Sequence, residues 1–400
     1  MGIVVLALNL RPVAVSIGPV LDEITDELGM SATAAGVLTT LPVLAYAIFG
    51  ALAPRLGHRI GVHRLTLASL LVLVAGLAVR AGVDSAAPFL ALSFLALAAT
   101  AIVNVYLPSL VKLHFPNRVG LLTSVYATAL AIGIASGSAV TAPVAEQFGS
   151  WRWGLLGWAF TAAIATLPWF ALVRHDRTSE SAGPGIRLGQ VARTRLGWTM
   201  AVFFACQAIQ AFAVFGWFAQ IYRDAGFSAT TAGLLLGVIT AIGIPISFWI
   251  PGFASRLTNQ SWLMVGLAAC YPIGYLGLLI APVEGAWVWA VVIGASTGVF
   301  PLAMTLIGLR SRTDVGTAAL SGFTQSVGYL IAGIGPFGMG FLYDLTGGWT
   351  VPLITLTVLA VPQLIAGLML SRPAYIEDAL PGSVRPSAPV KAEAREGLGA

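Results

Sequence analysis

Stretches of about 20 apolar residues, the length that crosses a bilayer as an α-helix, recur along the whole chain and constrain its fold more than any other feature. They are continuously apolar rather than alternating, which excludes a membrane β-barrel. The sequence therefore predicts an all-α integral membrane protein. We place twelve transmembrane helices at residues 2–25, 31–54, 62–82, 88–111, 119–145, 151–173, 198–222, 228–253, 261–281, 286–309, 315–343 and 350–370.

The composition agrees with this fold class. Charged residues make up 9% of the chain, against about 25% in soluble globular domains, and the mean hydropathy is +0.88. Most of the chain therefore has no aqueous surface to cover. The two cysteines, Cys206 and Cys270, lie singly in apolar stretches, so we expect no disulfide framework, no metal site and no cofactor.

Basic residues set the orientation. If both termini are cytoplasmic, the outer loops hold only Arg80, Arg152 and Arg223, and Arg11 lies inside the first helix. This bias fits the positive-inside rule, and it explains the net charge of +5 without a nucleic-acid partner. The apolar run begins at Met1 without a basic flank, so we expect no cleavable signal peptide. The predicted inner side holds 17 of the 21 basic residues: Arg55, Arg59, Arg64, Lys112, Arg118, Arg174, Arg177, Arg187, Arg193, Arg195, Arg256, Arg310, Arg312, Arg372, Arg385, Lys391 and Arg395.

Two polar segments divide the chain. Residues 174–197 are basic and rich in Gly and Ser, which predicts a cytoplasmic linker. Residues 371–400 hold Pro, Ala and charges without an apolar period, which predicts a disordered cytoplasmic tail. We therefore predict six-helix bundles at residues 1–173 and 198–370.

The two halves resemble each other. SATAAGVL at 31–38 matches SATTAGLL at 228–235 with an offset of 197 residues, and EQFGSW matches DLTGGW with an offset of 198. Both copies run in the same direction, which predicts a parallel repeat about an axis along the membrane normal. The alternative is that serine before an apolar helix is merely a common N-cap.

The loop after the second apolar stretch, GALAPRLGHRIG at 50–61, resembles the major facilitator signature G-x-x-x-D-R-x-G-R-R. Four of its positions match, and Pro54 replaces the signature aspartate. The resemblance implies a gating loop made by Gly50, Arg55, Gly57 and Arg59.

Other segments are similar to the cyanate and nitroimidazole permease family within that superfamily. They are ALNLRP at 7–12, NVYLPSLVKLHFP at 104–116 and DLTGGW at 344–349. This resemblance extends from residue 7 to about residue 370. It implies a multi-pass solute permease of the bacterial inner membrane, and it does not fix the substrate.

Arg11 is the sharpest functional candidate. It falls near the middle of the first apolar stretch, and no Asp or Glu falls deep in any stretch. An arginine at that depth costs about 2.5–3.5 kcal/mol on insertion scales, so something must compensate it. We predict that Arg11 faces a central aqueous cavity and binds an anion or an electron-rich polar group of the substrate. The alternative is a structural role, in which Arg11 bonds carbonyls of a helix broken at Pro12.

Uncharged polar side chains inside the predicted helices are the remaining candidates for a substrate site near the midplane. Their spacing places Gln207, Gln210 and Trp217 on one helix face, and Gln325 and Tyr329 one turn apart. The alternative for each is interhelical hydrogen bonding or packing. With Arg11, the predicted substrate-binding residues are Asn9, Asn104, Tyr106, Tyr126, Gln207, Gln210, Trp217, Gln325 and Tyr329.

Three further patterns have structural interpretations. The G-x-x-x-G motifs at 133–137 and 294–298 predict close helix packing. The acids between residues 22 and 27 are interpreted as a solvated face, and Lys112 as a positive-inside residue.

The sequence favours a transporter over other classes. It contains no H-E-x-x-H or G-x-S-x-G motif and no histidine in a predicted span, which argues against a membrane-embedded enzyme. A receptor or channel stays open, but the tandem repeat favours alternating access. We predict a monomeric secondary transporter of a small anionic or polar solute, with the lipid bilayer and that solute as its partners. Export of neutral or weakly acidic aromatic compounds is the alternative.

Overall fold

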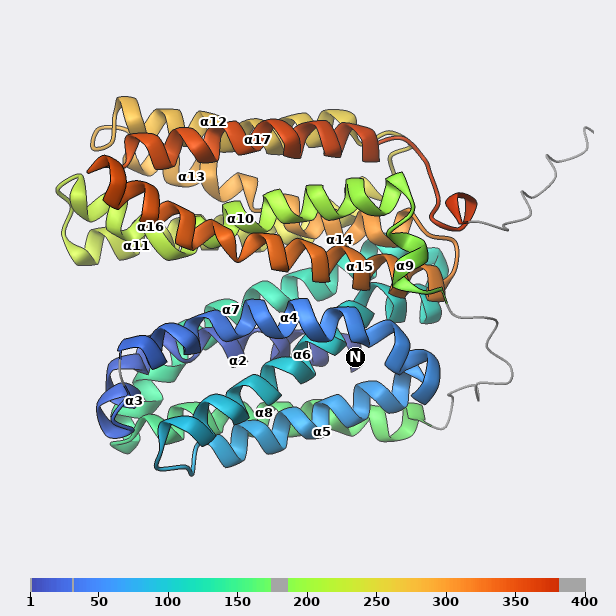
Figure 1. Cartoon of the computed structure of the whole chain (residues 1–400), viewed down its shortest axis with the longest axis horizontal. Coiled ribbons are helices and arrows are strands. Elements are labelled where there is room, and N and C mark those ends of the chain that lie inside the picture. The colour runs from blue at the N-terminus through green and yellow to red at the C-terminus, as the bar shows by residue number, and fades with distance from the viewer. Residues whose placement is uncertain (1, 31, 174–185, 381–400) are drawn as a thin grey trace, which may run out of the picture.

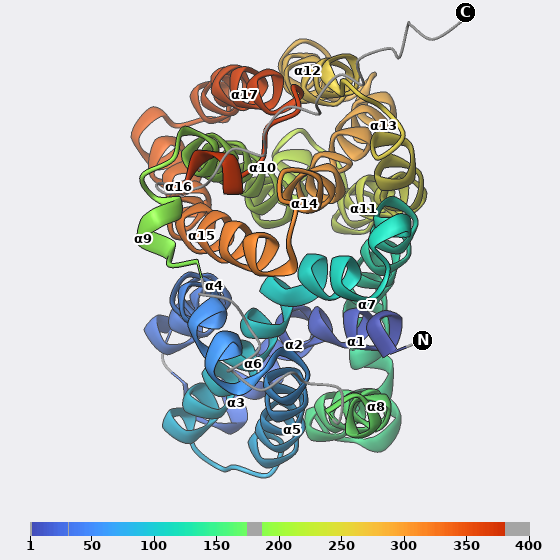
Figure 2. The ribbon, with the colours of Figure 1, turned by 90° about the vertical axis from the view of Figure 1, so that its right-hand side faces the viewer.

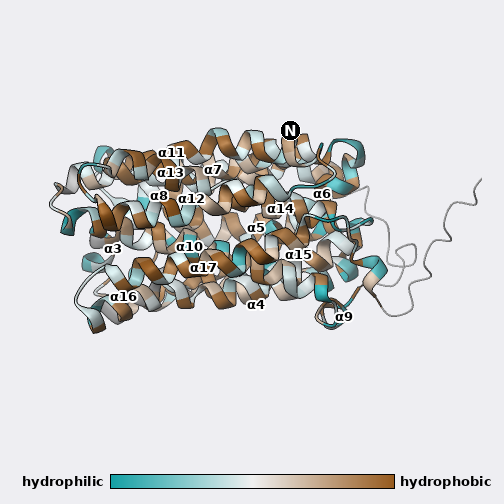
Figure 3. Ribbon diagram, turned by 90° about the horizontal axis from the view of Figure 1, so that it is seen from above, coloured by the Kyte–Doolittle hydropathy of each residue, from teal (hydrophilic) through white to brown (hydrophobic). Residues whose placement is uncertain are grey.

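The computed structural model describes residues 2–30, 32–173 and 186–380. Within these residues, twelve helical spans are long and apolar enough to cross a membrane. This confirms the prediction of an all-α protein with twelve spans. Polar residues gather near the two ends of the molecule, whereas apolar residues predominate along the helices between them (Figure 3).

The spans form two bundles that lie side by side (Figure 1). The N-half (residues 2–173) and the C-half (residues 195–370) are also separate in the view along the helices (Figure 2). The N-half contains α1 (Gly2–Leu10), α2 (Pro12–Val15), η1 (Gly18–Val20), α3 (Leu21–Glu27), α4 (Ala32–Ile60), α5 (Val62–Arg80), α6 (Ala86–His114), η2 (Pro116–Arg118), α7 (Val119–Phe148) and α8 (Trp151–Leu172). After α9 (Leu188–Val191), the C-half contains α10 (Arg195–Asp224), α11 (Ala229–Ala254), α12 (Ser261–Ile280), α13 (Ala286–Ser296), α14 (Val299–Leu309), α15 (Asp314–Ala332), α16 (Ile334–Thr346) and α17 (Thr350–Leu370).

The two ends of the bundles differ in charge. One end, called the basic end below, carries Arg59 near the end of α4, Arg118 in η2, and the loops with Arg256 and Arg312. The opposite end carries the loops that join α5 to α6, α7 to α8, and α16 to α17. This division lets each contact between the halves be assigned to one end.

Glycines with positive φ reveal the repeat in the backbone. Gly29 and Gly226 have φ values of 59° and 102°, and they are 197 residues apart. Gly149 and Gly347, 198 residues apart, have φ values of 69° and 67°, and each caps the C-terminus of its helix in the left-handed conformation. Because glycine adopts that conformation without a steric penalty, both halves turn with the same chemistry at equivalent places.

Side chains repeat as well. The indole N–H of Trp151 donates to Glu27 at 2.6 Å, and that of Trp349 donates to Asp224 at 2.8 Å. The tryptophans differ by 198 positions and the acids by 197. The same tryptophan–carboxylate hydrogen bond therefore ties each half at the opposite end, as expected for a parallel repeat.

Three spans are interrupted rather than continuous. The first breaks at Arg11, before Pro12, because proline has no N–H to donate to Leu8 and its ring disfavours the preceding turn. The tenth breaks between α13 and α14, and the eleventh breaks at Gly333 between α15 and α16. The predicted helix ranges run through all three positions. Pro301 and Pro336 each lie one turn after their break and, like Pro12, have no N–H to donate to the carbonyl four residues earlier. By contrast, α6 and α7 run through Pro108 and Pro143 without a break.

The linker and tail are only partly described. Residues 174–185 and 381–400 of the predicted segments lie outside the described residues. The described part of the tail is folded, contrary to the expectation of disorder from residue 371. Glu377 begins the short helix η4 (Glu377–Ala379), and its carboxylate accepts hydrogen bonds from the backbone N–H groups of Arg312 and Thr313 at 2.9 Å.

Candidate functional site

A cavity of about 160 Å³ lies between the two halves. An apolar cavity of about 150 Å³ in another protein binds benzene, so this volume suits a small planar solute. Its apolar wall comes from Ala127, Leu130, Ala131, Ile134, Ala135, Ala208, Ala211, Phe212, Val214, Phe215, Ile293, Phe300 and Pro301. Its polar groups come from Arg11, Gln207, Thr240, Ser247, Tyr271, Ser296, Thr297 and Tyr329.

Arg11 reaches this cavity because the first span is broken at that residue. Its carbonyl accepts hydrogen bonds from Ala14 and Val15 at 3.1 and 3.3 Å, which caps α2. The backbone approach is close: a Cβ on Gly133 would overlap the Leu8 carbonyl, and a Cβ on Gly137 would lie 3.0 Å from the Pro12 Cα. The first G-x-x-x-G motif therefore makes room for the broken helix, as its small-residue spacing predicts.

Aromatic rings surround the Arg11 guanidinium. Its Cζ lies 5.9 Å from the centroid of the Tyr46 ring and 5.3 Å from that of Phe300. Tyr329 is its hydrogen-bonding neighbour, and the rings of Tyr46 and Tyr329 meet edge to face at 4.9 Å. The guanidinium Nε has no hydrogen-bond partner. Arg11 thus carries the only formal charge among the described residues that line the cavity, and its surroundings are cation–π contacts and phenols rather than carboxylates.

Three of the predicted substrate-binding residues line the cavity: Arg11, Gln207 and Tyr329. Gln207 is 3% exposed, and its side-chain oxygen has no hydrogen-bond partner, so the cavity wall holds an available acceptor. The sequence reasoning misses Phe300 and Tyr46 beside Arg11. Aromatic residues inside apolar stretches give no signal that separates a cavity wall from a lipid-facing surface.

Other predicted residues belong to helix packing. Asn9 donates to the carbonyl of Val5 in its own helix at 2.8 Å. Gln210 donates to the carbonyl of Leu356 at 3.2 Å and accepts from the Tyr275 hydroxyl at 2.8 Å. Side chains three residues apart on a helix point in directions that differ by about 60° around its axis. Gln210 therefore points away from the cavity that Gln207 lines. Trp217 packs against Trp349 with ring centroids 5.7 Å apart, and Tyr126 is wholly buried in α7 without lining the cavity.

Asn104 and Gln325 form a pair between the halves. The Asn104 amide donates to the Gln325 side-chain oxygen at 2.5 Å, and the Gln325 amide donates to Ser321 at 2.8 Å. Neither Asn104 nor Gln325 lines the cavity. The pair lies between the cavity and the basic end, one helical turn from Tyr329 on α15.

Further contacts join the halves at the basic end. The ammonium group of Lys112 donates to the carbonyl oxygens of Gly308, at 2.9 Å, and of Ser311. Ser109 donates to the Asp314 carbonyl at 2.9 Å, and the Gly252 N–H donates to Ser124 at 2.9 Å. Lys112 is therefore more than a surface charge that sets topology. It caps carbonyls of the other half, and the basic end is closed.

The signature-like loop takes part in this closure through shape. The side chain of Pro54 lies against Gly322 of the C-half, where a Cβ would lie 2.5 Å from the proline ring. Tyr106 donates to the carbonyl of Ala53 at 3.1 Å and fills the space that a side chain at Gly57 would take. Gly50 lies beside Ser326 of the C-half, whereas Arg55 and Arg59 are exposed.

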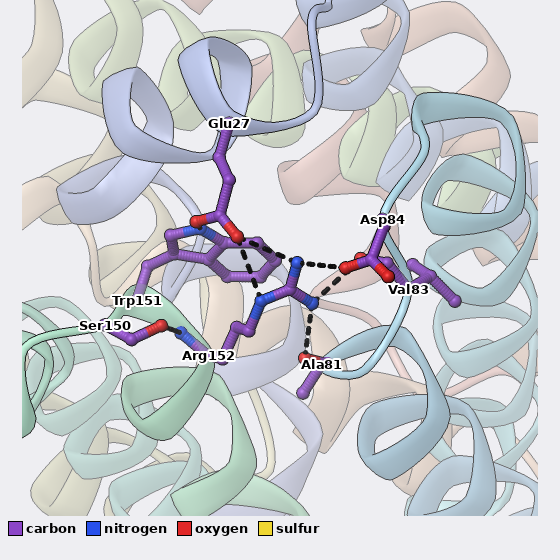
Figure 4. A network of polar contacts seen from close by, with 7 residues as sticks. All are labelled: Glu27, Ala81, Val83, Asp84, Ser150, Trp151 and Arg152. Atoms are coloured by element: carbon purple, nitrogen blue, oxygen red, sulfur yellow. Dashed lines mark hydrogen bonds and ion pairs between the residues drawn. The ribbon is translucent and has the colours of Figure 1, made fainter.

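At the opposite end, Arg152 gathers a polar network (Figure 4). Its guanidinium donates to Glu27 at 2.9 Å, to Asp84 at 2.8 Å, and to the carbonyls of Ala81 and Val83. The hydrogen bond from Arg152 to Glu27, together with the one from Trp151, lowers the pKa of the Glu27 carboxyl. Glu27 is exposed, as the interpretation of these acids as a solvated face expects, and it is also part of this structural cap.

Arg80 also differs from expectation. The sequence places it in an outer loop, but it ends α5 and is wholly buried, with its guanidinium 3.4 Å from the Ser93 hydroxyl and over the Phe89 ring at 6.0 Å. The sequence shows only that Arg80 lies near the end of a predicted helix, and this position does not tell whether its side chain is buried or exposed.

The arrangement of two six-helix halves around a central cavity matches known proteins. The sequence profile of the Major Facilitator Superfamily matches residues 4–336. The chain belongs to the Major Facilitator Superfamily. The crystal structure of the facilitator FucP in its outward conformation superposes with a TM-score of 0.74 at 15% identity, covering 93% of this chain and 99% of that one. This likeness confirms the major facilitator fold.

Curated relatives of this facilitator cover nearly all of its length. The uncharacterized transporter YycB of Bacillus subtilis is 36% identical over 94% of both chains. The 2-nitroimidazole transporter of Escherichia coli is 32% identical, covering 93% of this chain and 94% of that one. The cyanate transport protein CynX of Escherichia coli is 27% identical over 87% and 90%. The resemblance to cyanate and nitroimidazole permeases is therefore confirmed, and the chain is a transporter-family protein.

Proposed function

We propose that this facilitator moves a small planar anion, or a nitro-heterocycle of similar shape, across the bacterial inner membrane by alternating access. The observation that carries the proposal is Arg11. It presents a lone positive charge to a cavity of about 160 Å³ whose other walls are apolar, aromatic or uncharged polar groups. A guanidinium offers a planar fork that grips a carboxylate-like or nitro group with two hydrogen bonds.

The remaining lining completes such a site without adding charge. The Phe300 ring can stack on a planar solute, while Tyr329 and Gln207 offer polar partners. Two relatives handle molecules of this size, according to their names: cyanate and 2-nitroimidazole. We infer a cytoplasmic basic end and cytoplasmic termini from the positive-inside rule. We infer a monomeric unit because the cavity is built from one chain.

Substrate binding by purified Arg11 variants tests the proposal. Cyanate, benzoate and 2-nitroimidazole are titrated against the parent, Arg11→Lys and Arg11→Gln. A hydrogen bond to a charged group contributes about 1.5–3 kcal/mol, so Arg11→Gln should weaken binding of the anions by about 10- to 100-fold. Arg11→Lys keeps the charge and loses the fork, so it should fall between the two.

Arg223→Gln is the matched control, because Arg223 is an exposed arginine near the end of α10. It should bind like the parent. If Arg11→Gln binds cyanate and benzoate as tightly as the parent, the anion site is refuted.

The aromatic wall favours a second candidate, export of neutral or weakly acidic aromatic compounds. In that case 2-nitroimidazole should bind equally well to the parent and to Arg11→Gln, while neither cyanate nor benzoate binds.

A further inference from the structure

We propose that this facilitator is an obligatory exchanger, which reorients readily with an anion bound and about 100-fold more slowly when empty. The inference rests on the proposed anion site and extends it from what is bound to how the transport cycle runs. It is carried by the lack of charge compensation around Arg11 within the described cavity.

No described residue on the cavity wall carries a negative charge that would neutralise Arg11. The lining residues Gln207, Thr297 and Tyr329 are polar but uncharged, and no carboxylate is among the described residues that line the cavity. The faces of Tyr46 and Phe300 offer a weak cation–π attraction, and the guanidinium Nε has no hydrogen-bond partner. In the empty state, water in the open cavity must solvate the charge.

Alternating access passes through a state in which both ends of the cavity are closed. The basic end is already closed here, by Lys112 on the Gly308 carbonyl and by the Asn104–Gln325 pair. Closing the other end around an empty site brings apolar wall residues such as Ile134 and Phe212 toward the charge and expels its water. A buried, unpaired charge is strongly disfavoured.

A bound anion removes this penalty. The guanidinium and the anion form a neutral, hydrogen-bonded pair, so the closed state no longer holds an isolated charge. On membrane-insertion scales, the free-energy cost of an uncompensated arginine at this depth corresponds to a factor of about 100 in an equilibrium constant. The loaded carrier should therefore cross the closed state about 100-fold faster than the empty one.

Proton coupling through the protein does not offer an alternative route to compensation. Every Asp and Glu among the described residues lies in a loop, in the described part of the tail or near the end of a span. A proton taken up by an uncharged residue would add to the positive charge rather than cancel it. The return step thus needs a second anion from the other side.

The test uses the full chain in proteoliposomes, with radiolabelled cyanate and, separately, radiolabelled benzoate outside. One set of vesicles is loaded with the same unlabelled anion, and the other holds only buffer with a weakly interacting counter-ion. The inference expects initial uptake into loaded vesicles to exceed that into empty vesicles by about 100-fold. A potassium diffusion potential or a pH gradient should not restore uptake into empty vesicles.

Equal initial rates into loaded and empty vesicles would overturn obligatory exchange while leaving the anion site intact. Absence of uptake of both probes into either set, with folded protein, would instead overturn the proposed function on which the inference rests. The two failures are therefore distinguishable.

The charge itself is tested with Arg11→Gln and the uncharged probe 2-nitroimidazole. A neutral solute does not cancel the guanidinium charge, so the parent should take up 2-nitroimidazole slowly into empty vesicles. Removing the guanidinium should let the carrier cross the closed state without an anion, so Arg11→Gln should take up 2-nitroimidazole into empty vesicles faster than the parent does. Arg223→Gln should match the parent. Uptake by Arg11→Gln that is no faster than the parent's would show that reorientation does not depend on this charge.

Discussion

Lys112→Met isolates the contact that we expect to contribute most to closing the basic end. The substitution keeps most of the apolar stem of Lys112 and removes its ammonium donors to Gly308 and Ser311. A charged hydrogen bond contributes about 1.5–3 kcal/mol when buried, but Lys112 is partly exposed and regains water when the halves separate. We therefore expect a loss of about 1.5–2 kcal/mol, which shifts the equilibrium toward an open basic end by about 10- to 30-fold.

The assay is labelling of a single cysteine from the basic side. Cys206 and Cys270 are replaced by alanine, and Ala318→Cys is introduced. Ala318 is 5% exposed and lies one turn before Gly322, on the face of α15 that meets Pro54. A membrane-impermeant maleimide should react with this cysteine about 10- to 30-fold faster in the Lys112→Met background.

Arg118→Met is the matched control, because Arg118 is an exposed basic residue at the same end. It removes the same charge without removing a contact between the halves, so labelling should stay at the parent rate. An unchanged rate in Lys112→Met would refute the reasoning. An equal increase in both variants would show that surface charge, rather than carbonyl capping, controls the closure.

Three further outcomes can be checked by thermal unfolding in detergent. Gly133→Ala should destabilise the fold by about 1–3 kcal/mol, because the new methyl group overlaps the Leu8 carbonyl. Gly157→Ala, whose methyl group meets open space, should be neutral or slightly stabilising. Equal effects of the two variants would contradict the close packing of Gly133 against the broken helix. Arg152→Met should lower the melting temperature more than Glu27→Gln, because it removes hydrogen bonds to two carbonyls as well as the ion pairs. The hydrogen bond from Arg152 lowers the pKa of the Glu27 carboxyl. The stability that the ionised carboxylate contributes is therefore present above the ordinary carboxyl pKa of about 4.3 and is lost as the pH falls through the lowered pKa. The melting temperatures of the parent and Glu27→Gln should converge on acidification, and a constant difference between them would count against the Arg152–Glu27 ion pair.

Span existence could be predicted from the sequence because length and hydrophobicity alone decide it. The offset repeat was likewise readable, since the glycine and tryptophan positions of the turns recur in both halves. The interruptions at residues 297–298 and 333 each lie one turn before a proline, Pro301 or Pro336, which has no N–H to donate to the carbonyl of Thr297 or Ala332. The prolines mark these positions in the sequence, but Pro108 and Pro143 lie in unbroken helices, so the packing of neighbouring helices decides which proline breaks a span.

The residues of the candidate site could be predicted only in part from the sequence, for a related reason. Arg11 stands out because a charge inside an apolar stretch is costly wherever it points. Asn104 and Gln325 show the limit of the same argument: a buried amide needs a partner, and sequence does not distinguish a substrate from an amide on another helix. Phe300 and Tyr46 carry no cost in an apolar stretch, so their position around Arg11 appears only in three dimensions.

The proline that stands where the superfamily signature has an aspartate also bears on the response to ionic strength. At the basic end, the contacts described above between the halves include a lysine on carbonyls, a pair of amides, hydroxyl contacts and the approach of Pro54 to Gly322. Mobile ions screen separated charges over a Debye length of about 8–10 Å, but they do not screen a neutral amide pair or a steric fit in contact. A gate closed in this way should open with nearly the same equilibrium in dilute buffer and in concentrated salt. A carrier of small anions can then keep its closed end closed while the ionic composition beside it varies.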